Sequence, residues 1–484
     1  EGRYWVGDNP SRTAVDLDGN MWVGGRNDGR LSKILWDITQ CPDRNGNGVI
    51  DTSVNMGAGP VRINSPADPL ADECIVYSQV PNPMRPSIRG IAAAPDGKIW
   101  IGYSGGGVQS IEPDTFTLGT FYPDNAVPLY APDANGKQVL QTDGNGNPLT
   151  GSTNGIYGLV VDNKGNLYVS TYLRTGIARF NTNTEQWEAL LTGHDCGSYG
   201  ISTDAEGRIW TGGWPGCPGI GMYDPVGERF HYFKVPRGTP STPGSTFGVD
   251  MGAEPGFLCN TADAAARYCV TGLAAEPATG DIWASFYRIG MTGRLQVNEQ
   301  DYSQSQWTLI GSTTDDQGAL LPGVSSGDLR GVGFDRHGFG WTLGLSSGKV
   351  WKIDPATNGR DASLPDGAII GEGSHYTYSD FTGSTALSFT APRGLWRYTF
   401  ETSFPTSLAE SIIIEAHVPV GTALEVRARP LDSGGTPGNW TPDMGYYTYP
   451  NGQQSHTIDL AAMSQTMQGT AFELEVRLST SDPD

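Results

Sequence analysis

The sequence predicts an all-β protein in which a six-bladed β-propeller is followed by a β-sandwich. Composition is the first reason, because 67 Gly and 33 Pro among 484 residues, with 10% aromatic residues, favour turn-rich β-structure. The second reason is a motif that recurs six times in the first three quarters of the chain, which predicts a repeat architecture. The third is that this repeat stops near Thr385, where strand-like runs of another pattern begin.

Each repeat joins two strands through a tight turn. In most repeats the first strand ends at an acidic residue, a Gly follows in the turn, and an aromatic residue stands three positions after the Gly. The acid can accept hydrogen bonds from the turn backbone, the Gly takes a positive φ, and the aromatic residue fills the wedge between blades. Two more strands follow in several repeats, which completes a propeller blade. The turn glycines are Gly19, Gly97, Gly165, Gly207, Gly280 and Gly338, and the aromatic residues are Trp22, Trp100, Tyr168, Trp210, Trp283 and Trp341.

The end of the repeat predicts two domains, a propeller over residues 1–384 with inserted loops and a β-sandwich over residues 385–484. A seventh blade, built from Asp366–Gly383 together with the N-terminal strand, is the alternative to six. Alternating apolar runs bounded by turn residues are typical of sandwich strands. In the second domain these runs are Leu395–Phe400, Ser411–Val418, Ala423–Ala428, His456–Leu460 and Ala471–Leu478.

The cysteines and the net charge predict where the protein works. No cysteines form a Cys-x-x-Cys pair, and no His lies at zinc-ligand spacing, so we expect three local disulfides. The expected pairs are Cys41–Cys74, Cys196–Cys217 and Cys259–Cys269. Disulfides indicate an extracellular, cell-surface or periplasmic protein, and buried thiols in the cytosol are the alternative. No apolar run reaches the roughly 18 residues of a membrane span. The net charge of −21 disfavours nucleic acid and anionic membranes as partners.

One inserted loop resembles the calcium loops of EF-hand and dockerin type. Residues 43–51 carry oxygen-bearing side chains at the first, third and fifth positions and a Gly at the sixth. Position 12 holds Val54 where a bidentate acid is usual, so Asp51 is expected to substitute for it. The sequence therefore predicts a structural calcium ion, with a plain Asn/Gly turn as the alternative. The expected ligands are Asp43, Asn45, Asn47, Val49 and Asp51.

A second set of candidate residues lies where the innermost strand of each blade begins, close to the propeller axis. We call these the axial residues: Ser11, Arg89, Tyr157, Tyr199, Thr271 and Arg330. Arg12 follows Ser11 at a position where the other five repeats have Gly, so it is expected to reach the same space. In a closed ring Arg330, Arg12 and Arg89 would be neighbours facing Tyr157 and Tyr199. Arg suits carboxylates and phosphates, and Tyr offers a stacking face with a hydroxyl. The alternative is that these arginines pair with nearby turn acids, such as Asp16 or Asp335, and fill the channel.

The repeat is similar to those of the streptogramin-lyase (virginiamycin B lyase-type) propellers and, more distantly, to the sensor propellers of two-component regulators. The resemblance is carried by Pro95–Gly102 followed by Gly105-Gly106-Gly107 and covers roughly residues 12–370. It implies the propeller fold and, for a lyase, a Glu just beyond the strand aromatic, His residues and a divalent metal. Glu is absent from the positions after the aromatic, which read Val23-Gly24-Gly25, Ile101-Gly102-Tyr103, Val169-Ser170-Thr171, Thr211-Gly212-Gly213, Ala284-Ser285-Phe286 and Thr342-Leu343-Gly344.

These observations favour a binding protein over an enzyme. We expect a small anionic or sugar-like ligand, or another surface protein, to bind at the funnel formed by Arg12, Arg89, Tyr157, Tyr199 and Arg330. The first rival is a metal-dependent lyase or hydrolase that uses the same funnel. The second is a structural subunit of an extracellular assembly, docked through the sandwich.

Overall fold

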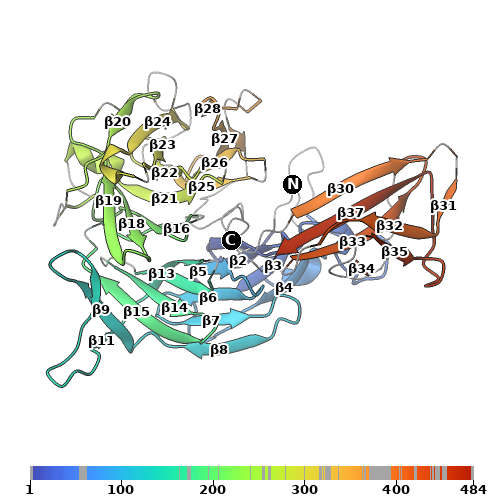
Figure 1. Cartoon of the computed structure of the whole chain (residues 1–484), viewed down its shortest axis with the longest axis horizontal. Coiled ribbons are helices and arrows are strands. Elements are labelled where there is room, and N and C mark those ends of the chain that lie inside the picture. Colours follow the sequence, from blue (N-terminus) through green and yellow to red (C-terminus); the bar gives the residue numbers. More distant parts are fainter. Residues whose placement is uncertain are drawn as a thin grey trace. The chain divides into compact units, whose positions relative to one another are not determined.

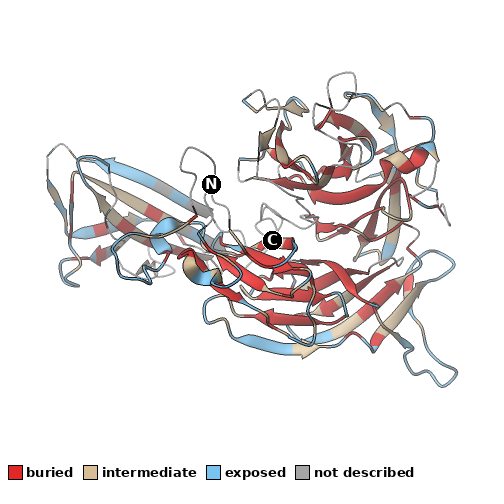
Figure 2. Ribbon diagram, turned by 180° about the vertical axis from the view of Figure 1, so that it is seen from behind, coloured by how far each residue is buried: buried red, intermediate tan, exposed pale blue. Residues whose placement is uncertain are grey.

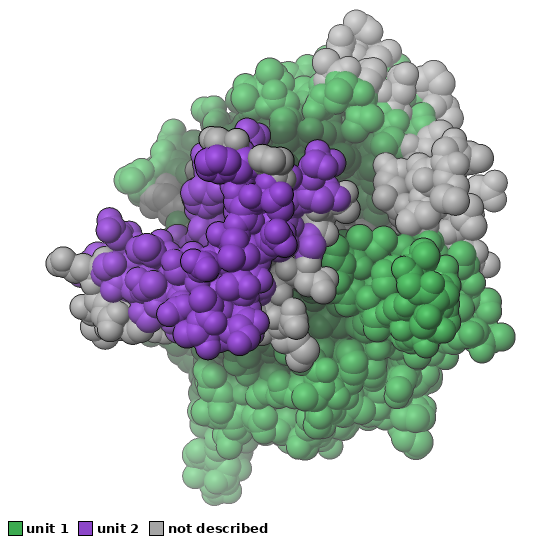
Figure 3. Space-filling view, turned by 90° about the vertical axis from the view of Figure 1, so that its right-hand side faces the viewer, with its two compact units in different colours: residues 1–388 green, residues 389–484 purple. Residues whose placement is uncertain are grey.

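The computed structural model shows a protein built almost entirely of β-strands (Figure 1). The structure describes residues 4–480 apart from 54–62, 163, 172–175, 195, 205, 240, 253–256, 260–262, 278, 299, 315–318, 320, 322–328, 336, 362, 365–366, 370–393, 403, 405, 419–421, 436–437, 439–440, 442–446 and 450–454. The chain divides into two compact units, residues 1–388 and 389–484, which Figure 3 colours separately.

The first unit is a β-propeller whose described residues form six sheets, numbered here in chain order. The first sheet contains β1 (Pro10–Val15), β2 (Met21–Gly25), β3 (Leu31–Ile34) and β4 (Ile75–Gln79). The second contains β5 (Ile88–Ala93), β6 (Ile99–Tyr103), β7 (Val108–Ile111) and β8 (Leu118–Tyr122). The third contains β12 (Ile156–Val161), β13 (Asn166–Thr171), β14 (Gly176–Asn181) and β15 (Gln186–Thr192), extended by β9 (Val127–Pro132), β10 (Gln138–Leu140) and β11 (Thr150–Gly151).

The remaining three sheets follow the same meander. The fourth contains β16 (Ile201–Thr203), β17 (Ile209–Gly212), β18 (Gly219–Asp224) and β19 (Arg229–Lys234). The fifth contains β21 (Val270–Ala275), β22 (Ile282–Phe286), β23 (Met291–Gln296) and β24 (Gln306–Gly311), with β20 (Thr246–Gly248) at its edge. The sixth contains β25 (Leu329–Phe334), β26 (Gly340–Gly344) and β27 (Lys349–Asp354), with β28 (Gly359–Arg360) and β29 (Ala368–Ile369) both paired to β27. Of the segment considered for a seventh blade, residues 366 and 370–383 lie outside the described residues.

Short 3-10 turns lie in the loops between these strands. They are η1 (Ile38–Gln40), η2 (Pro69–Ala71), η3 (Ala264–Tyr268) and η4 (Tyr302–Gln304). Over the described residues, the structure has no helix of the length and apolarity that crossing a membrane requires.

The predicted turn chemistry is present, and the acid of the turn also binds the aromatic residue. The Asp16 carboxylate accepts the backbone N–H of Asn20 at 2.8 Å and the indole Nε1–H of Trp22 at 2.9 Å. Asp204, Glu276 and Asp335 accept the indole N–H of the Trp in their own repeats at 2.6, 2.9 and 2.8 Å, respectively. All six turn glycines have φ between +75° and +90°, where a Cβ is unfavourable. In these four repeats the turn therefore fixes the Trp side chain that follows it.

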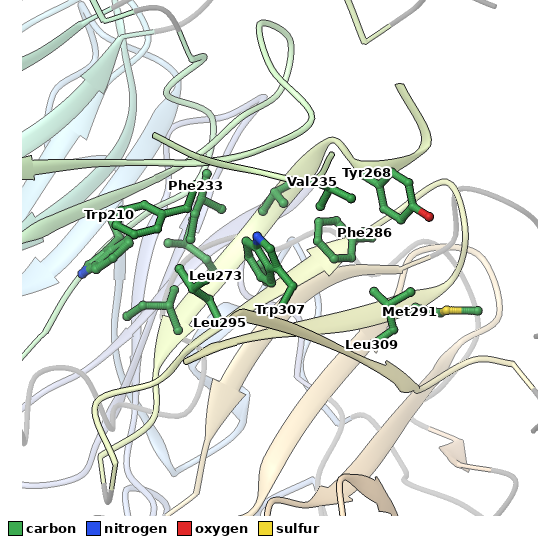
Figure 4. Close-up of a cluster of buried hydrophobic side chains, with 14 of the residues drawn as sticks. Trp210, Phe233, Val235, Tyr268, Leu273, Phe286, Met291, Leu295, Trp307 and Leu309 are labelled. Atoms are coloured by element: carbon green, nitrogen blue, oxygen red, sulfur yellow. The ribbon is translucent and has the colours of Figure 1, made fainter. Parts of the chain in front are cut away.

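Hydrophobic clusters lie between consecutive sheets, as the wedge argument predicts. The largest joins Trp210 and Phe233 of the fourth sheet to Leu273, Phe286 and Trp307 of the fifth (Figure 4). Similar clusters join the first sheet to the second, the second to the third, the third to the fourth and the fifth to the sixth. Figure 2 shows the buried strands that result. Removing this apolar surface from water is the main force that holds neighbouring blades together.

The innermost strands approach each other closely because five of the six have a Gly near their start. A Cβ on Gly200 would lie 2.4 Å from the carbonyl oxygen of Thr271, and one on Gly272 would lie 2.4 Å from that of Arg330. A Cβ on Gly90 would lie 2.6 Å from the Cβ of Leu159. Only Gly allows this spacing. The first repeat has Arg12 at this position.

The three predicted disulfides are confirmed. Cys41 pairs with Cys74, Cys196 with Cys217, and Cys259 with Cys269. The first closes the loop that contains residues 43–51. The other two lie beside the starts of β16 and β21, where axial residues also stand.

The second unit is a β-sandwich. One sheet has the order β30 (Gly394–Glu401), β37 (Ala471–Thr480), β33 (Thr422–Leu431) and β34 (Tyr447–Thr448). Two strand pairs complete the unit, β31 (Ser407–Ala409) with β36 (Met467–Gly469) and β32 (Ser411–Glu415) with β35 (Ser455–Asp459). Its core contains Ile412, Val426, Ile458 and Leu460.

Candidate functional site

Arg12 is a buried structural residue that links three blades. Its side chain lies across the starts of the first three innermost strands and is only 1% exposed. Nε donates to the carbonyl oxygens of Arg89 at 2.7 Å and Tyr157 at 3.0 Å, and Nη2 donates to Tyr157 at 2.8 Å. Nη1 donates to the carbonyl oxygen of Ser11 at 2.7 Å. The planar guanidinium can serve several fixed acceptors together.

Arg89, Tyr157 and Tyr199 lie next to Arg12, as expected. The Arg89 guanidinium carbon is 4.2 Å from the ring centroid of Tyr157, and that of Arg12 is 4.7 Å from the same ring. The Tyr157 and Tyr199 hydroxyls are 2.5 Å apart, and their ring centroids are 4.3 Å apart. Arg89 and Tyr157 are buried, whereas Tyr199 is partly exposed. The structure therefore brings four of the five funnel residues into one cluster.

Arg330, the fifth funnel residue, interacts with a different tyrosine. Its guanidinium carbon lies 5.0 Å from the ring centroid of Tyr287, and its Nη1 donates to the carbonyl oxygen of Leu329 at 3.0 Å. Its own carbonyl oxygen accepts hydrogen bonds from Ser285 at 2.6 Å and Thr271 at 3.2 Å, which joins the fifth and sixth sheets. Arg330 is partly exposed.

Trp214 and Tyr287 are site residues that the sequence reasoning missed. The rings of Trp214 and Tyr199 meet edge to face with their centroids 4.5 Å apart, and the backbone N–H of Trp214 donates to the carbonyl oxygen of Val270. Both Trp214 and Tyr287 are partly exposed and pack on the small core beside the Cys259–Cys269 disulfide. They come just after β17 and β22, the second strands of their sheets. In an antiparallel pair the end of the second strand lies beside the start of the first. The residues just after each second strand could therefore have been predicted from the sequence to lie near the axial residues.

We call Tyr199, Trp214, Tyr287 and Arg330 the axial arc. All four side chains are partly exposed, unlike Arg12, Arg89 and Tyr157 beside them. Three aromatic rings with one guanidinium offer stacking faces and a fork of donors. Groups of these kinds can stack on a flat ring and bind an anion.

The predicted calcium loop is a compact turn organised by carboxylates. Asp43 accepts backbone N–H groups from Gly46 at 2.7 Å and Gly48 at 2.8 Å. The side-chain amides of Asn45 and Asn47 both donate to Asp51 Oδ2, at 2.7 and 3.1 Å. The side chains of Asn45, Asn47 and Asp51 therefore converge, and the oxygen atoms of these three residues and of Asp43 are of the type that a hard cation prefers.

Glu73, which sequence reasoning missed, organises the same loop from outside it. The carboxylate is buried and accepts the backbone N–H groups of Arg44 at 2.6 Å, Asn45 at 3.3 Å and Asp51 at 2.8 Å. Its neighbour Cys74 is held by the first disulfide. No group of three or more His, Cys, Asp or Glu positioned for a metal occurs in the part of the chain that the structure describes.

His194 is the most perturbed histidine, and it has a packing role. It is fully buried, with its ring stacked on Phe230 at 4.5 Å, and its Nε2 lies 2.8 Å from Thr211 Oγ1. Burial lowers the pKa of His194 to about 3, because charging the ring would cost its hydration. The His194 ring packs against Gly221, where an added Cβ would lie only 2.1 Å from His194 Cε1.

Comparison with known proteins supports the fold and no activity. No protein-family model and no curated protein matches the chain. A streptogramin B lyase structure is 14% identical with a TM-score of 0.36, covering 56% of this chain and 66% of that one. Virginiamycin B lyase from Staphylococcus aureus is 12% identical with a TM-score of 0.43, covering 72% and 81%. Hydrazine synthase from Kuenenia stuttgartiensis is 10% identical with a TM-score of 0.39, covering 73% and 79%. The resemblance predicted from the repeat is thus confirmed, as a likeness of fold to the streptogramin-lyase type of β-propeller.

Proposed function

We propose that this protein binds a small anionic or sugar-like ligand at the axial arc and that it works outside the cytosol. The observation that carries the proposal is the grouping of Tyr199, Trp214 and Tyr287 with Arg330 at the starts of the innermost strands. Exposed aromatic side chains lose less conformational entropy on binding a ligand than long flexible side chains do, because they have few rotatable bonds. The disulfides beside the arc favour an oxidising compartment.

The buried cluster beneath the arc supports binding by making the site rigid. Arg12 holds the backbone at Arg89 and Tyr157, and the Tyr157 hydroxyl lies within hydrogen-bonding distance of the Tyr199 hydroxyl. Groups whose positions are already fixed lose little entropy when a ligand arrives. Arg12 and Arg89 therefore support the site, and Arg330 is the cation that would meet the ligand.

The test is a binding screen with defined probes. Glucuronate and galacturonate, their neutral parent sugars and benzoate would be titrated into the parent protein by calorimetry and thermal shift. We expect a charged sugar to bind more tightly than its neutral parent, and Arg330→Gln to remove that difference. Arg229→Gln, at an exposed site on β19, is the matched control and should bind as the parent does. If Arg330→Gln and Trp214→Ala bind every probe as the parent does, the axial arc is not the site.

A structural calcium ion in the loop 43–51 is a separate part of the proposal. Its support is the convergence of Asn45 and Asn47 on Asp51, the turn that Asp43 organises and the hydrogen bond from the loop backbone to Glu73. Asp43, Asn45, Asn47 and Asp51 would supply side-chain oxygens, and Val49 its carbonyl. The ion would tie the loop together beside the Cys41–Cys74 disulfide.

A further inference from the structure

The second unit carries a stripe of exposed aromatic side chains on an edge strand. Trp396, Tyr398 and Phe400 alternate along β30 and are 51%, 50% and 48% exposed. Trp396 and Tyr398 stack at 5.5 Å, and Tyr398 meets Phe400 at 4.8 Å. Figure 2 shows the exposed character of this strand. Contiguous apolar surface of this kind marks an interaction site more often than scattered apolar residues do.

The stripe continues the hydrophobic face of its own sheet. In the register of β30 with β37, the three aromatic residues lie opposite Val476, Leu474 and Phe472, in that order. Those three β37 residues pack against the core of the sandwich. The apolar face of the sheet therefore extends one strand beyond the part that the sandwich covers. Apolar neighbours on this side favour a polypeptide occupant over a glycan, which would need polar partners.

β30 also has the backbone features of a docking edge. Among the described residues its one paired neighbour is β37, so the N–H and C=O groups of every second residue along this eight-residue strand point to an edge with no strand partner there. Natural edge strands are usually short or blocked by Pro, a charged residue or a bulge. β30 has eight residues with no Pro, no Lys and no bulge in its register with β37, and its charged residues are Arg397 and Glu401. An extended strand can add to such an edge through main-chain hydrogen bonds.

We propose that the occupant is a second copy of this chain, with two β30 strands paired antiparallel about Tyr398. The stripe is nearly symmetric about this residue, as an isologous contact requires. Such pairing places Trp396 of one copy opposite Phe400 of the other, and Arg397 opposite Thr399. Leu395 then faces Glu401, so no two like charges lie opposite each other.

The contact area sets the expected strength. Aromatic side chains expose about 150–250 Å² each when unburied, so three half-exposed rings on each of two copies offer on the order of 600 Å². Stable interfaces bury about 1,200–2,000 Å². The dimer is therefore weak and forms at high protein concentration. Because each copy has a net charge of −21, added salt should strengthen association by screening repulsion.

The first test measures the oligomeric state of the full chain by sedimentation velocity across protein and salt concentrations. We expect a monomer–dimer equilibrium that Tyr398→Lys weakens by about tenfold or more, since the buried ammonium would lose hydration without a partner. Ile413→Lys on β32, at a site 64% exposed, is the matched control and should leave the equilibrium unchanged. Monomer under every condition, or a dimer that Tyr398→Lys does not weaken, would overturn the proposal.

Cysteine cross-linking tests the register and does not depend on the lysine variant folding. Directly opposed residues have Cα atoms roughly 4.5–5.5 Å apart, within the range of about 4.4–6.8 Å that a disulfide spans. Tyr398→Cys should therefore form a covalent dimer under mild oxidation. Phe400→Cys should not, because its two copies would be separated by about 13 Å along the strands. Equal cross-linking by both variants refutes the register. Retention of a monomeric parent on an insoluble polysaccharide, lost in Tyr398→Ala, would assign the stripe to a glycan instead.

Discussion

Arg12 donates two hydrogen bonds to the carbonyl oxygen of Tyr157, from Nε at 3.0 Å and Nη2 at 2.8 Å, across 145 residues of sequence. Arg12 stands where the other repeats have Gly. The first blade therefore places a long side chain at the position where Gly lets the innermost strands of other blades approach each other closely. The guanidinium thereby satisfies carbonyl groups at the starts of three innermost strands. This position therefore stabilises the propeller and holds the residues beneath the axial arc in place.

Replacing Arg12 should destabilise the propeller. Arg12→Ala leaves buried carbonyl oxygens without their donor, and we expect a loss of about 2–4 kcal/mol in the free energy of unfolding. Arg12→Lys retains the charge and loses the fork, so it should lie between the parent and the alanine variant. Denaturant unfolding measures both. A loss no greater than that of the exposed-site control Arg229→Ala would show that the hydrogen bonds contribute little.

A substitution in the second repeat should stabilise the protein. The position of Asp16 is taken there by Ala94, and Trp100 Nε1 is buried with no hydrogen-bond partner among the described residues. The turn backbone is otherwise the same, since Ala94 N–H donates to Lys98 as Asp16 N–H does to Asn20. Ala94→Asp should therefore raise the unfolding free energy by about 1 kcal/mol.

The reverse change provides the control for that experiment. Asp335→Ala removes the acceptor of Trp341 Nε1–H and of two turn N–H groups, so it should lower stability. A lower melting temperature for Ala94→Asp would show that burying the carboxylate costs more than the hydrogen bonds recover.

Acid should destabilise the protein partly through His194. The folded pKa of His194 is about 3, below the unfolded value of about 6.5, so its contribution is fully present above pH 6.5. As the pH falls below 6.5 the unfolded chain takes up a proton and the folded chain does not, which costs about 1.4 kcal/mol per pH unit. His194→Gln should lose this part of the pH dependence in melting curves.

The slope difference between parent and variant isolates this residue. Burial raises the pKa values of the carboxyl groups of Asp162, Asp204 and Glu276, and they titrate in both proteins. Identical slopes between pH 6 and pH 4 would mean that His194 becomes protonated in the folded state.

Calcium removal should lower the melting temperature if the loop 43–51 binds the ion, because a ligand held only by the folded state stabilises that state. Asp43→Ala should abolish the difference between chelated and calcium-loaded protein. Asp143→Ala, in an exposed turn of similar sequence, is the control and should keep the difference. An unchanged melt of the parent with chelator would identify the loop as an ordinary turn.

The disulfides should stabilise the folded protein, so reducing them should lower the free energy of unfolding. Removing Cys196–Cys217 by paired alanine substitutions should cost roughly 2–4 kcal/mol in the chain-entropy model, since the bond constrains the unfolded chain. Peptide mapping without reductant should recover the same three pairs. Free thiols at these positions in protein purified under oxidising conditions would contradict the pairing.

The sequence by itself determined the features that depend on near neighbours in the chain. The turn that joins Asp16, Gly19 and Trp22 spans seven residues, so its chemistry is readable and recurs. The local spacing of the cysteines likewise predicted all three disulfides. The repeat predicted the propeller, and its end predicted a separate sandwich.

Only the tertiary structure decided which side chains meet. Arg12 reaches Tyr157, and Trp214 meets Tyr199, because separate strands begin or end at the same edge of the propeller. It also decided burial, which makes Arg12 a structural residue and leaves Arg330 partly exposed beside Tyr287. These outcomes depend on how blades pack and how closely their backbones approach. A linear pattern cannot encode such distances, because they are set by all the neighbouring side chains together.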